Sequence, residues 1–190
     1  MELYLTDDDA ANRLLSANPF ALITGMLLDQ QVTMESAFAG PAKLAERIGE
    51  YSPAAVAEMD PDAFLEAFRQ KPAVHRFPSS MAGRVQTLAQ TICQEYDGET
   101  ANIWLQADPD GAEVLRRLKA LPGFGEQKAR IFLALLGKQY GLRAAGWREA
   151  TGEYGEADAK ISVADVVDPQ TLEQVRQMKK QRKAAAKKAS

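Results

Sequence analysis

The stretch VLRRLKALPGFGEQKARIFLALLGKQYG, residues 114–141, decides the fold of this chain. Its apolar residues first recur at helical spacing, which predicts an amphipathic helix that ends at about Leu121. A Pro-Gly-Phe-Gly turn follows at 122–125, and helical spacing resumes near Glu126. We therefore expect two helices joined by a tight hairpin, with Leu121 and Phe124 packed beneath the turn.

The two glycines of this turn suit contact with a phosphate group. Gly123 and Gly125 can adopt backbone angles closed to other residues, and without a Cβ they let a phosphate approach the backbone closely. Free N–H groups at the start of the second helix then point at the anion, helped by the positive end of the helix dipole. Lys128 and Arg130 add positive charge beside it. The pattern predicts a phosphate-binding helix-hairpin-helix, although a plain Pro-Gly turn between two helices would share part of it.

Charge is unevenly distributed along the chain. The 190 residues include 23 Lys or Arg and 26 Asp or Glu, which gives a formal net charge of −3. Residues 116–148 and 176–190 together hold 15 basic residues and one acid, Glu126, so these segments carry +14 and the remainder −17. This asymmetry predicts contact with a polyanion on one side of the molecule, although a basic tail can also be a solvated helix end.

Helix signals recur along the rest of the chain. Asp-Pro pairs at 60–61, 108–109 and 168–169 each place an N-cap acceptor before a proline at the first helical position. Runs of alternating β-branched residues are almost absent, which predicts an all-α fold of roughly ten short helices. Further helices are expected at 10–17, 20–28, just after Thr33, 41–48 and 79–95, the last being the longest.

The chain shows no convincing linker, so we expect one domain, residues 1–175, followed by a basic helical tail, residues 176–190. The least regular stretch is 141–160, with four glycines and no clear periodicity. A connection of this length is expected to be either a functional loop or a disordered one.

Two rare residue types exclude several kinds of site. The single cysteine, Cys93, rules out an intramolecular disulfide and any site built from several cysteines, and it fits a reducing compartment. The single histidine, His75, argues against a histidine-rich metal site and a Ser/His/Asp triad. No stretch approaches the ~18 uninterrupted apolar residues of a membrane helix, and the amino terminus is acidic rather than a basic leader. We expect a cytoplasmic protein with no metal site and no membrane partner.

Two stretches of the chain resemble the helix-hairpin-helix (HhH-GPD) DNA glycosylases of base excision repair, relatives of endonuclease III and the alkyladenine glycosylases. One is LPGFGEQKARIFLALLGKQYG; the other is FALITGMLLDQQVTMESAF, residues 20–38, about ninety residues before the hairpin. The similarity covers about residues 15–150 and implies a compact HhH-GPD-like helical domain. In such enzymes a side chain from the early loop fills the gap left by a flipped-out nucleotide. Gln31, and less directly Gln30, would be that wedge, although both also fit a polar helix end.

The chain departs from the family at the position of a functional lysine. Members that also cleave the DNA backbone carry a nucleophilic lysine two residues after the second hairpin glycine, where this chain has Gln127. Glutamine cannot form a Schiff base, so abasic-site lyase activity is not expected unless Lys128 is recruited; Lys128 fits a phosphate contact better. The iron–sulfur cluster of some members needs four cysteines and is therefore not expected. A monovalent cation at the hairpin is the one cofactor left open.

The catalytic aspartate of the family is missing at its expected place. The resemblance puts it eighteen to twenty residues beyond the lysine position, where this chain reads Ala-Gly-Trp at 145–147. In the family this carboxylate stabilises the oxocarbenium-like sugar and helps to activate water. Glu149 on the same loop and Asp29 beside the wedge are the candidate substitutes. Each of them also fits an ordinary surface acid.

An extruded base would need pocket walls, and aromatic side chains are the usual choice. Trp147 and Tyr154 are the candidates on the irregular stretch, with Phe77 and Trp104 as further ones. Core packing is the alternative for each of them. His75 and Arg76 lie in a loop between two prolines that could touch DNA, although a lone histidine is more often part of the core.

These features predict a monofunctional DNA glycosylase, a hydrolase that cleaves the N-glycosidic bond of a damaged or mispaired base after base flipping. Its partner would be double-stranded DNA containing a lesion, bound by a monomer associated with the nucleoid. The missing aspartate supports an alternative, a catalytically inactive helix-hairpin-helix protein that binds DNA and senses damage. An adaptor that recruits a repair partner is a third hypothesis.

Overall fold

The fold consists of helices, as a computed structural model of the chain shows for residues 2–188. No strand occurs within this range, which confirms the all-α prediction. The helices are α1 (Asp9–Ala17), α2 (Pro19–Leu28), α3 (Met34–Ile48), α4 (Pro53–Glu58), α5 (Pro61–Arg69), α6 (Pro78–Glu95), α7 (Asn102–Leu105), α8 (Gly111–Ala120), α9 (Glu126–Gln139), α10 (Trp147–Thr151) and α11 (Pro169–Lys188), with 3-10 turns η1 (Gly152–Gly155) and η2 (Val163–Asp165).

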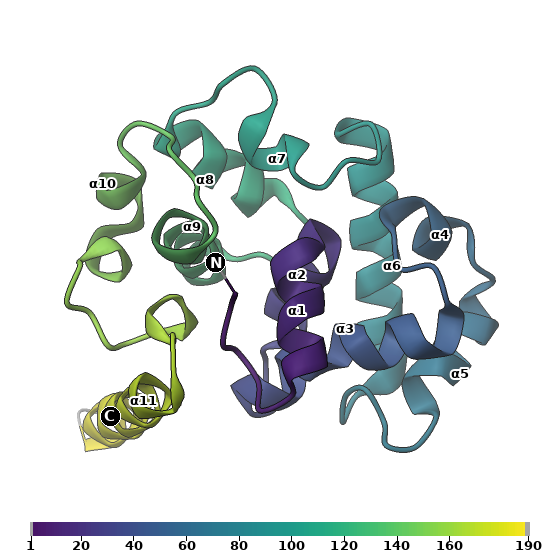
Figure 1. Ribbon diagram of the computed structural model, residues 1–190, viewed down its shortest axis with the longest axis horizontal. Helices are drawn as coiled ribbons and strands as arrows, with labels where there is room; N and C mark the ends of the chain where they lie inside the picture. Colours follow the sequence, from purple (N-terminus) through teal and green to yellow (C-terminus); the bar gives the residue numbers. More distant parts are fainter. Residues whose placement is uncertain (1, 189–190) are drawn as a thin grey trace.

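The helices form two groups on either side of α1 and α2 (Figure 1). One group is α3 to α6, in which α4 and α5 pack on α6; the other gathers α8, α10, η1 and η2 around α9. Every residue of α2 from Phe20 to Leu28 is buried. A helix that is apolar all round belongs in the centre of a fold, so α2 ends, at Asp29, where the two groups meet.

The N-cap predictions hold at two of the three Asp-Pro pairs. Asp60 caps α5, and Asp168 accepts a hydrogen bond from the backbone N–H of Thr171 at 2.7 Å at the start of α11. The prediction for Asp108-Pro109 is wrong, because Asp110 is the residue that caps α8. The backbone N–H of Gly111 donates to the Ala145 carbonyl at 2.7 Å, so a contact with the distant chain fixes where this helix begins.

The structure corrects three other predictions about where helices begin and end. The two helices expected after Thr33 and at 41–48 are one helix, α3, with Pro41 inside it. Gly40 and Pro41 are buried, and a Cβ on Gly40 would lie 2.7 Å from Leu28 Cδ1, so close packing on α2 offsets the cost of an internal proline. The longest described helix is α11, not α6, and the irregular stretch 141–160 contains α10 and η1.

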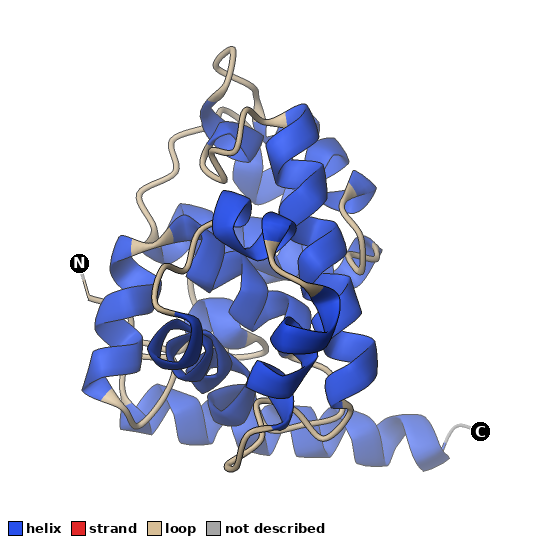
Figure 2. Cartoon of the chain, turned by 90° about the vertical axis from the view of Figure 1, so that its right-hand side faces the viewer, coloured by secondary structure: helices blue, strands red, loops and turns tan. Residues whose placement is uncertain are grey.

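The predicted boundary at 175 falls inside α11, which crosses it without a break. The start of α11 is docked by the buried side chains of Leu172 and Val175. Figure 2 shows the helix running along one side of the molecule, with its C-terminal part projecting past the other helices. There Arg182 pairs with Glu153 of η1 at 2.8 Å. Among residues 2–188 no helix is both long enough and apolar enough to cross a membrane.

Candidate nucleic-acid interface

The hairpin between α8 and α9 is held against the C-terminal end of α2. Gly123 has φ +79°, and a Cβ built on it would lie 2.4 Å from Leu27 Cδ1. Leu121 and Phe124 are buried beneath the turn, as the sequence predicts. Positive φ and a close neighbour both require glycine here. The turn is therefore locked in place by contact with Leu27.

Gly125 lies at the N-cap of α9 and has a different role from Gly123. Its φ is −77°, and a Cβ on it would have no neighbour within 4 Å. Among the described residues no side chain caps this end of the 14-residue helix α9. The first N–H groups of α9 are thus open to an anion from outside.

An acid and two bases flank this helix start. Glu126, the first residue of α9, pairs with Lys119 of α8 and with Arg130, the latter at 2.8 Å. The hydrogen bond from Lys119, and then the one from Arg130, lowers the pKa of Glu126. Part of the positive charge that the sequence predicts for phosphate contact is therefore neutralised within the protein.

Lys128 turns inward, toward α2, rather than outward. Its Nζ donates a hydrogen bond to the Leu27 carbonyl at 2.9 Å and lies 6.0 Å from the centre of the Phe124 ring. Burial lowers the pKa of Lys128 to about 8, opposed by the nearby charge of Asp29 and aided by that of Arg84. The amine thus joins the hairpin to the end of α2, a placement that does not match the phosphate contact expected for it.

Gln127, at the position of the family's lysine, reaches the other side of the hairpin. Its Nε2 donates to the Tyr154 hydroxyl at 3.0 Å. Tyr154 is buried in η1, so this bond ties the start of α9 to the chain beyond α10.

The turn between α2 and α3, residues 29–33, separates the roles of its two glutamines. Gln30 is tied inward: Nε2 donates to the Leu27 carbonyl at 2.8 Å, and Oε1 accepts from Arg84 at 3.0 Å. Gln31 is exposed and has φ 59°, a left-handed conformation that costs free energy for a residue with a side chain. Of the two, Gln31 is the side chain that faces solvent, and Gln30 is the one that stiffens the turn.

The loop before α6 supports the same turn. His75 is buried; its Nδ1 accepts from the Phe77 N–H at 3.1 Å, so Nε2 carries the proton and donates to the Gln30 carbonyl at 3.0 Å. Burial lowers the pKa of His75, which favours this neutral form. Phe77 is 41% exposed, with the Arg76 guanidinium 4.9 Å from its ring centre. The loop thus fixes the backbone of the turn at Gln30 and presents an exposed aromatic ring with a cation beside it.

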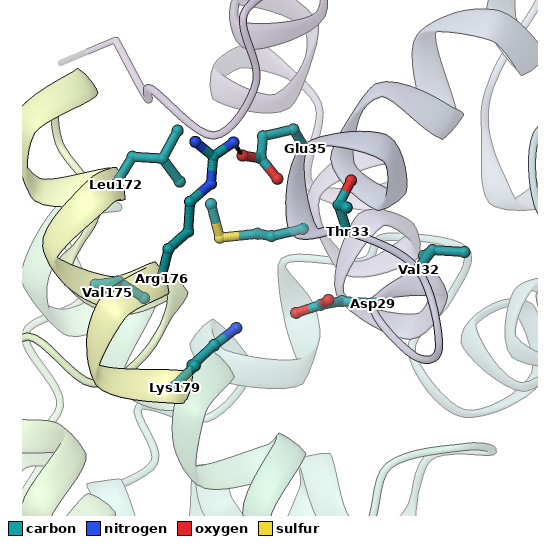
Figure 3. A pocket seen from close by; sticks show the side chains of 9 residues that line it. Asp29, Val32, Thr33, Glu35, Leu172, Val175, Arg176 and Lys179 are labelled. Atoms are coloured by element: carbon teal, nitrogen blue, oxygen red, sulfur yellow. Dashed lines mark hydrogen bonds and ion pairs between the residues drawn. The ribbon is translucent and has the colours of Figure 1, made fainter. Parts of the chain in front are cut away.

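A cavity of about 240 Å³ opens between the α2–α3 turn and α11. Figure 3 shows the Asp29 carboxylate and the Lys179 side chain directed into the same space from opposite sides. Val32, Met34, Leu172 and Val175 supply apolar walls. Arg176 of α11 pairs with Glu35 of α3 across the cavity. Asp29 thus borders this cavity, and its charge also acts on Lys128 of the hairpin.

The geometry of hairpin and turn agrees with what comparison with known proteins finds. A family profile described as HhH-GPD superfamily base excision DNA repair protein matches residues 24–190. The chain belongs to the HhH-GPD superfamily. No curated protein and no solved structure matches it. Membership implies base excision repair of DNA, and the hairpin, the α2–α3 turn and α11 all fall within the matched range.

Residues 145–147, where the resemblance expects the catalytic aspartate of HhH-GPD members, lead into α10 and hold no acid. Glu149 lies two residues further on, is exposed, and does not line the cavity next to Asp29. Trp147 is half-buried against α9, where a Cβ on Gly137 would lie 2.4 Å from its indole ring. Neither Trp147 nor Tyr154 lines the cavity, and Trp104 is buried in the core beside Phe132, 6.1 Å between ring centres. The pocket role of these aromatic residues stays a prediction.

Several residues of this HhH-GPD site are not apparent from sequence reasoning. Arg84, on α6, holds Gln30, and Met34 and Lys179 line the cavity. Each comes from a different helix, and although Met34 and Lys179 lie in stretches that the sequence singles out, nothing local indicates that they share a cavity. Only the helical spacing of Leu172 and Val175 hints that α11 docks on the body at all.

Proposed function

We propose that the protein is a monofunctional DNA glycosylase, which binds duplex DNA at the hairpin and hydrolyses the N-glycosidic bond of a base flipped out of the helix. The observation that carries the proposal is the position of Asp29. Its carboxylate borders the cavity, stands in the same turn as the exposed Gln31, and lies close enough to the hairpin lysine Lys128 for its charge to raise the pKa of that amine.

In this proposal the duplex is held by backbone groups rather than by base contacts. The open N–H groups at the start of α9 bind one phosphate, and the basic side chains of α11 add affinity that is independent of sequence. Gln31 enters the stack where the nucleotide leaves it, since it is exposed at the tip of a turn that Gln30 and His75 hold rigid.

The carboxylate of Asp29 does the electrostatic part of the chemistry. Departure of the base leaves positive charge on the deoxyribose, and a fixed carboxylate in a site from which water is partly excluded stabilises that charge. Water then adds to the sugar carbon and loses a proton. Glu149 is the weaker candidate for this role, because it is exposed on α10 and borders a different surface.

Gln127 supports a monofunctional reaction. An amide has no nucleophilic amine, and its Nε2 already donates to Tyr154. We therefore assign the protein to hydrolysis alone, without cleavage of the DNA backbone.

One observation favours the second candidate, a non-catalytic damage sensor: residues 145–147 hold no acid. A panel of duplexes that differ only in one lesion separates the two functions. For each, free base is measured directly and abasic sites are revealed by alkali. The glycosylase releases a base from at least one lesion and nicks only after alkali treatment. Tight binding to a duplex with an abasic-site analogue, with no base released from any lesion, would establish the sensor instead.

A further inference from the structure

We propose that His75 is a positioning residue for the wedge glutamine: its imidazole fixes the peptide group between Gln30 and Gln31, and so holds Gln31 in the conformation that enters DNA. The inference rests on the proposed function for the role of Gln31. It deepens that function by naming a residue that decides how strongly the protein prefers DNA that lacks a base. It concerns binding and does not depend on which acid is catalytic.

The conformation of Gln31 needs to be held in place. Its φ of 59° lies in the left-handed region, which residues with a side chain disfavour. Such a conformation persists where the surrounding structure over-determines it. The side chain of Gln31 is exposed to solvent, so the restraint has to come from the backbone around it.

A hydrogen bond from His75 supplies this restraint. Its Nε2 donates to the Gln30 carbonyl at 3.0 Å. That carbonyl belongs to the planar peptide group that joins Gln30 to Gln31. The φ angle of Gln31 measures rotation between this plane and the rest of the residue, so a bond that holds the plane also restrains φ. The imidazole therefore acts one peptide group away from the wedge.

The loop that carries the imidazole is itself fixed to the rest of the fold. Arg47 of α3 donates hydrogen bonds to the carbonyls of Ala67 and Pro72, at 2.7 Å each. Val74, which directly precedes His75, is 1% exposed. The imidazole thus extends from a rigid support, and the turn is held at a defined distance from α3 and α5.

The bond to the turn requires a neutral ring with its proton on Nε2. Nδ1 accepts the Phe77 N–H at 3.1 Å, and a proton on Nδ1 would place two donors against each other. Burial lowers the pKa of His75, against the opposing effect of its bond to the Gln30 carbonyl. The nearby cations Arg76 and Lys128 lower it further. The surroundings therefore favour the form of the ring that can hold the turn.

Two amide substitutions separate the two bonds of the imidazole. His75→Gln reaches as far as Nε2 does and can still donate to the Gln30 carbonyl. His75→Asn is one bond shorter, so it can accept the Phe77 N–H but ends short of the turn. Both side chains are neutral and polar, which makes them a matched pair. Val74→Ala is the control for lost packing in the same loop.

The measurement is the affinity of the full chain for two duplexes of one sequence, one undamaged and one with a tetrahydrofuran abasic analogue. The ratio of the two dissociation constants is the preference for a missing base. Phosphate contacts are common to both duplexes, so this ratio isolates the side chain that fills the gap. Gln31→Ala is measured alone and combined with His75→Asn. Thermal unfolding shows which variants are folded.

We expect Gln31→Ala and His75→Asn each to lower this preference by at least about threefold. The double variant should lose no more than either single variant, because both changes act through the same side chain. His75→Gln and Val74→Ala should keep the wild-type preference. If His75→Asn lowers the preference equally in the absence of the Gln31 side chain, or if folded His75→Gln loses it too, the inference is wrong.

A spectroscopic measurement on the wild-type protein tests the same bond without any substitution. His75 is the single histidine of the chain, so ¹⁵N-labelled histidine gives one set of imidazole signals. At neutral pH these should report a neutral ring with the proton on Nε2, both free and bound to the abasic duplex. A charged ring, or a proton on Nδ1, would contradict the inference.

The inference and the glycosylase proposal fail in different ways. Equal affinity of the wild-type protein for the two duplexes would show that Gln31 is not a wedge and would overturn the inference. Base release enters none of these measurements. A protein that releases no base but keeps the expected pattern of preferences would refute the glycosylase proposal and support the role of His75.

Discussion

Replacing Gly123 by alanine tests the contact that holds the hairpin on α2. The substitution places an L-residue at φ +79° and a Cβ 2.4 Å from Leu27 Cδ1. A left-handed backbone costs about 1–2 kcal/mol for such a residue, and overpacking a buried side chain costs about 1–3 kcal/mol more. The expected loss of stability is therefore about 2–5 kcal/mol, or a fall in Tm of roughly 5–15 °C for a chain of this size.

The assay is thermal unfolding followed by far-ultraviolet circular dichroism at neutral pH. Gly125→Ala is the matched control, because Gly125 has φ −77° and open space at its Cβ. Its unfolding free energy should change by less than about 1 kcal/mol, whereas its affinity for DNA should fall because the methyl group shields the first N–H groups of α9. If Gly123→Ala melts within about 2 °C of wild type, or if the two variants lose equal stability, the hairpin is not locked by Leu27.

Four further predictions concern charge. The pKa of Lys128, about 8, lies below that of an unfolded lysine, so the unfolded chain binds more protons between about pH 8 and 10 and stability should rise with pH relative to a Lys128→Met variant. Urea unfolding at both pH values would show no difference in pH dependence between the two chains if the amine is solvated in the folded state. Asp29→Asn should lower the pKa of Lys128 further, because it removes the negative charge that raises this pKa. Mass spectrometry of Lys128 acylation against pH should show a lower midpoint in the variant, and an unchanged midpoint would show that Asp29 and Lys128 do not interact. Lys138→Met removes the ion-pair partner of the Asp165 carboxylate, whose side chain is 1% exposed, and should lower the free energy of unfolding by about 3–5 kcal/mol. A loss below about 1 kcal/mol would mean that the hydrogen bonds from the Ile161 and Ser162 N–H groups are enough to stabilise the buried carboxylate. Deleting residues 183–190 removes three lysines and leaves the cavity side of α11 intact, so the affinity for all duplexes should fall by a similar factor. The slope of log K against log salt concentration should become shallower by up to about 0.9 for each phosphate no longer neutralised. An unchanged slope would show that this end of α11 does not touch DNA.

Local signals in the sequence predict the helices and the hairpin well. Gly123, Leu121 and Phe124 stand within a few residues of one another, and the turn they form depends mainly on their own backbone preferences and burial. The errors, at Asp108-Pro109 and at Pro41, arise where a distant segment decides the outcome. Gly111 meets the backbone before α10, and Gly40 meets α2, and neither contact leaves a local pattern.

The candidate site was only partly predictable for the same reason. Asp29, Lys128 and Lys179 lie between 51 and 150 residues apart along the chain, and only packing of α9 and α11 against the end of α2 brings them together. Whether Lys128 or its neighbour Gln127 points inward depends on the rotation of α9. That rotation is set by the burial of Ala129 and Phe132, a tertiary effect that the motif alone does not specify.

The most direct test of the account compares Asp29→Asn with Glu149→Gln in single-turnover base release from the duplex whose lesion the wild-type protein removes fastest. Both changes remove one negative charge and keep the shape of the side chain. With Asp29 as the group that stabilises the sugar cation, Asp29→Asn should slow release by at least about 100-fold while binding to an abasic analogue persists, and Glu149→Gln should leave the rate unchanged. The opposite pattern, full activity in Asp29→Asn and loss in Glu149→Gln, would contradict the account and move the active site to α10.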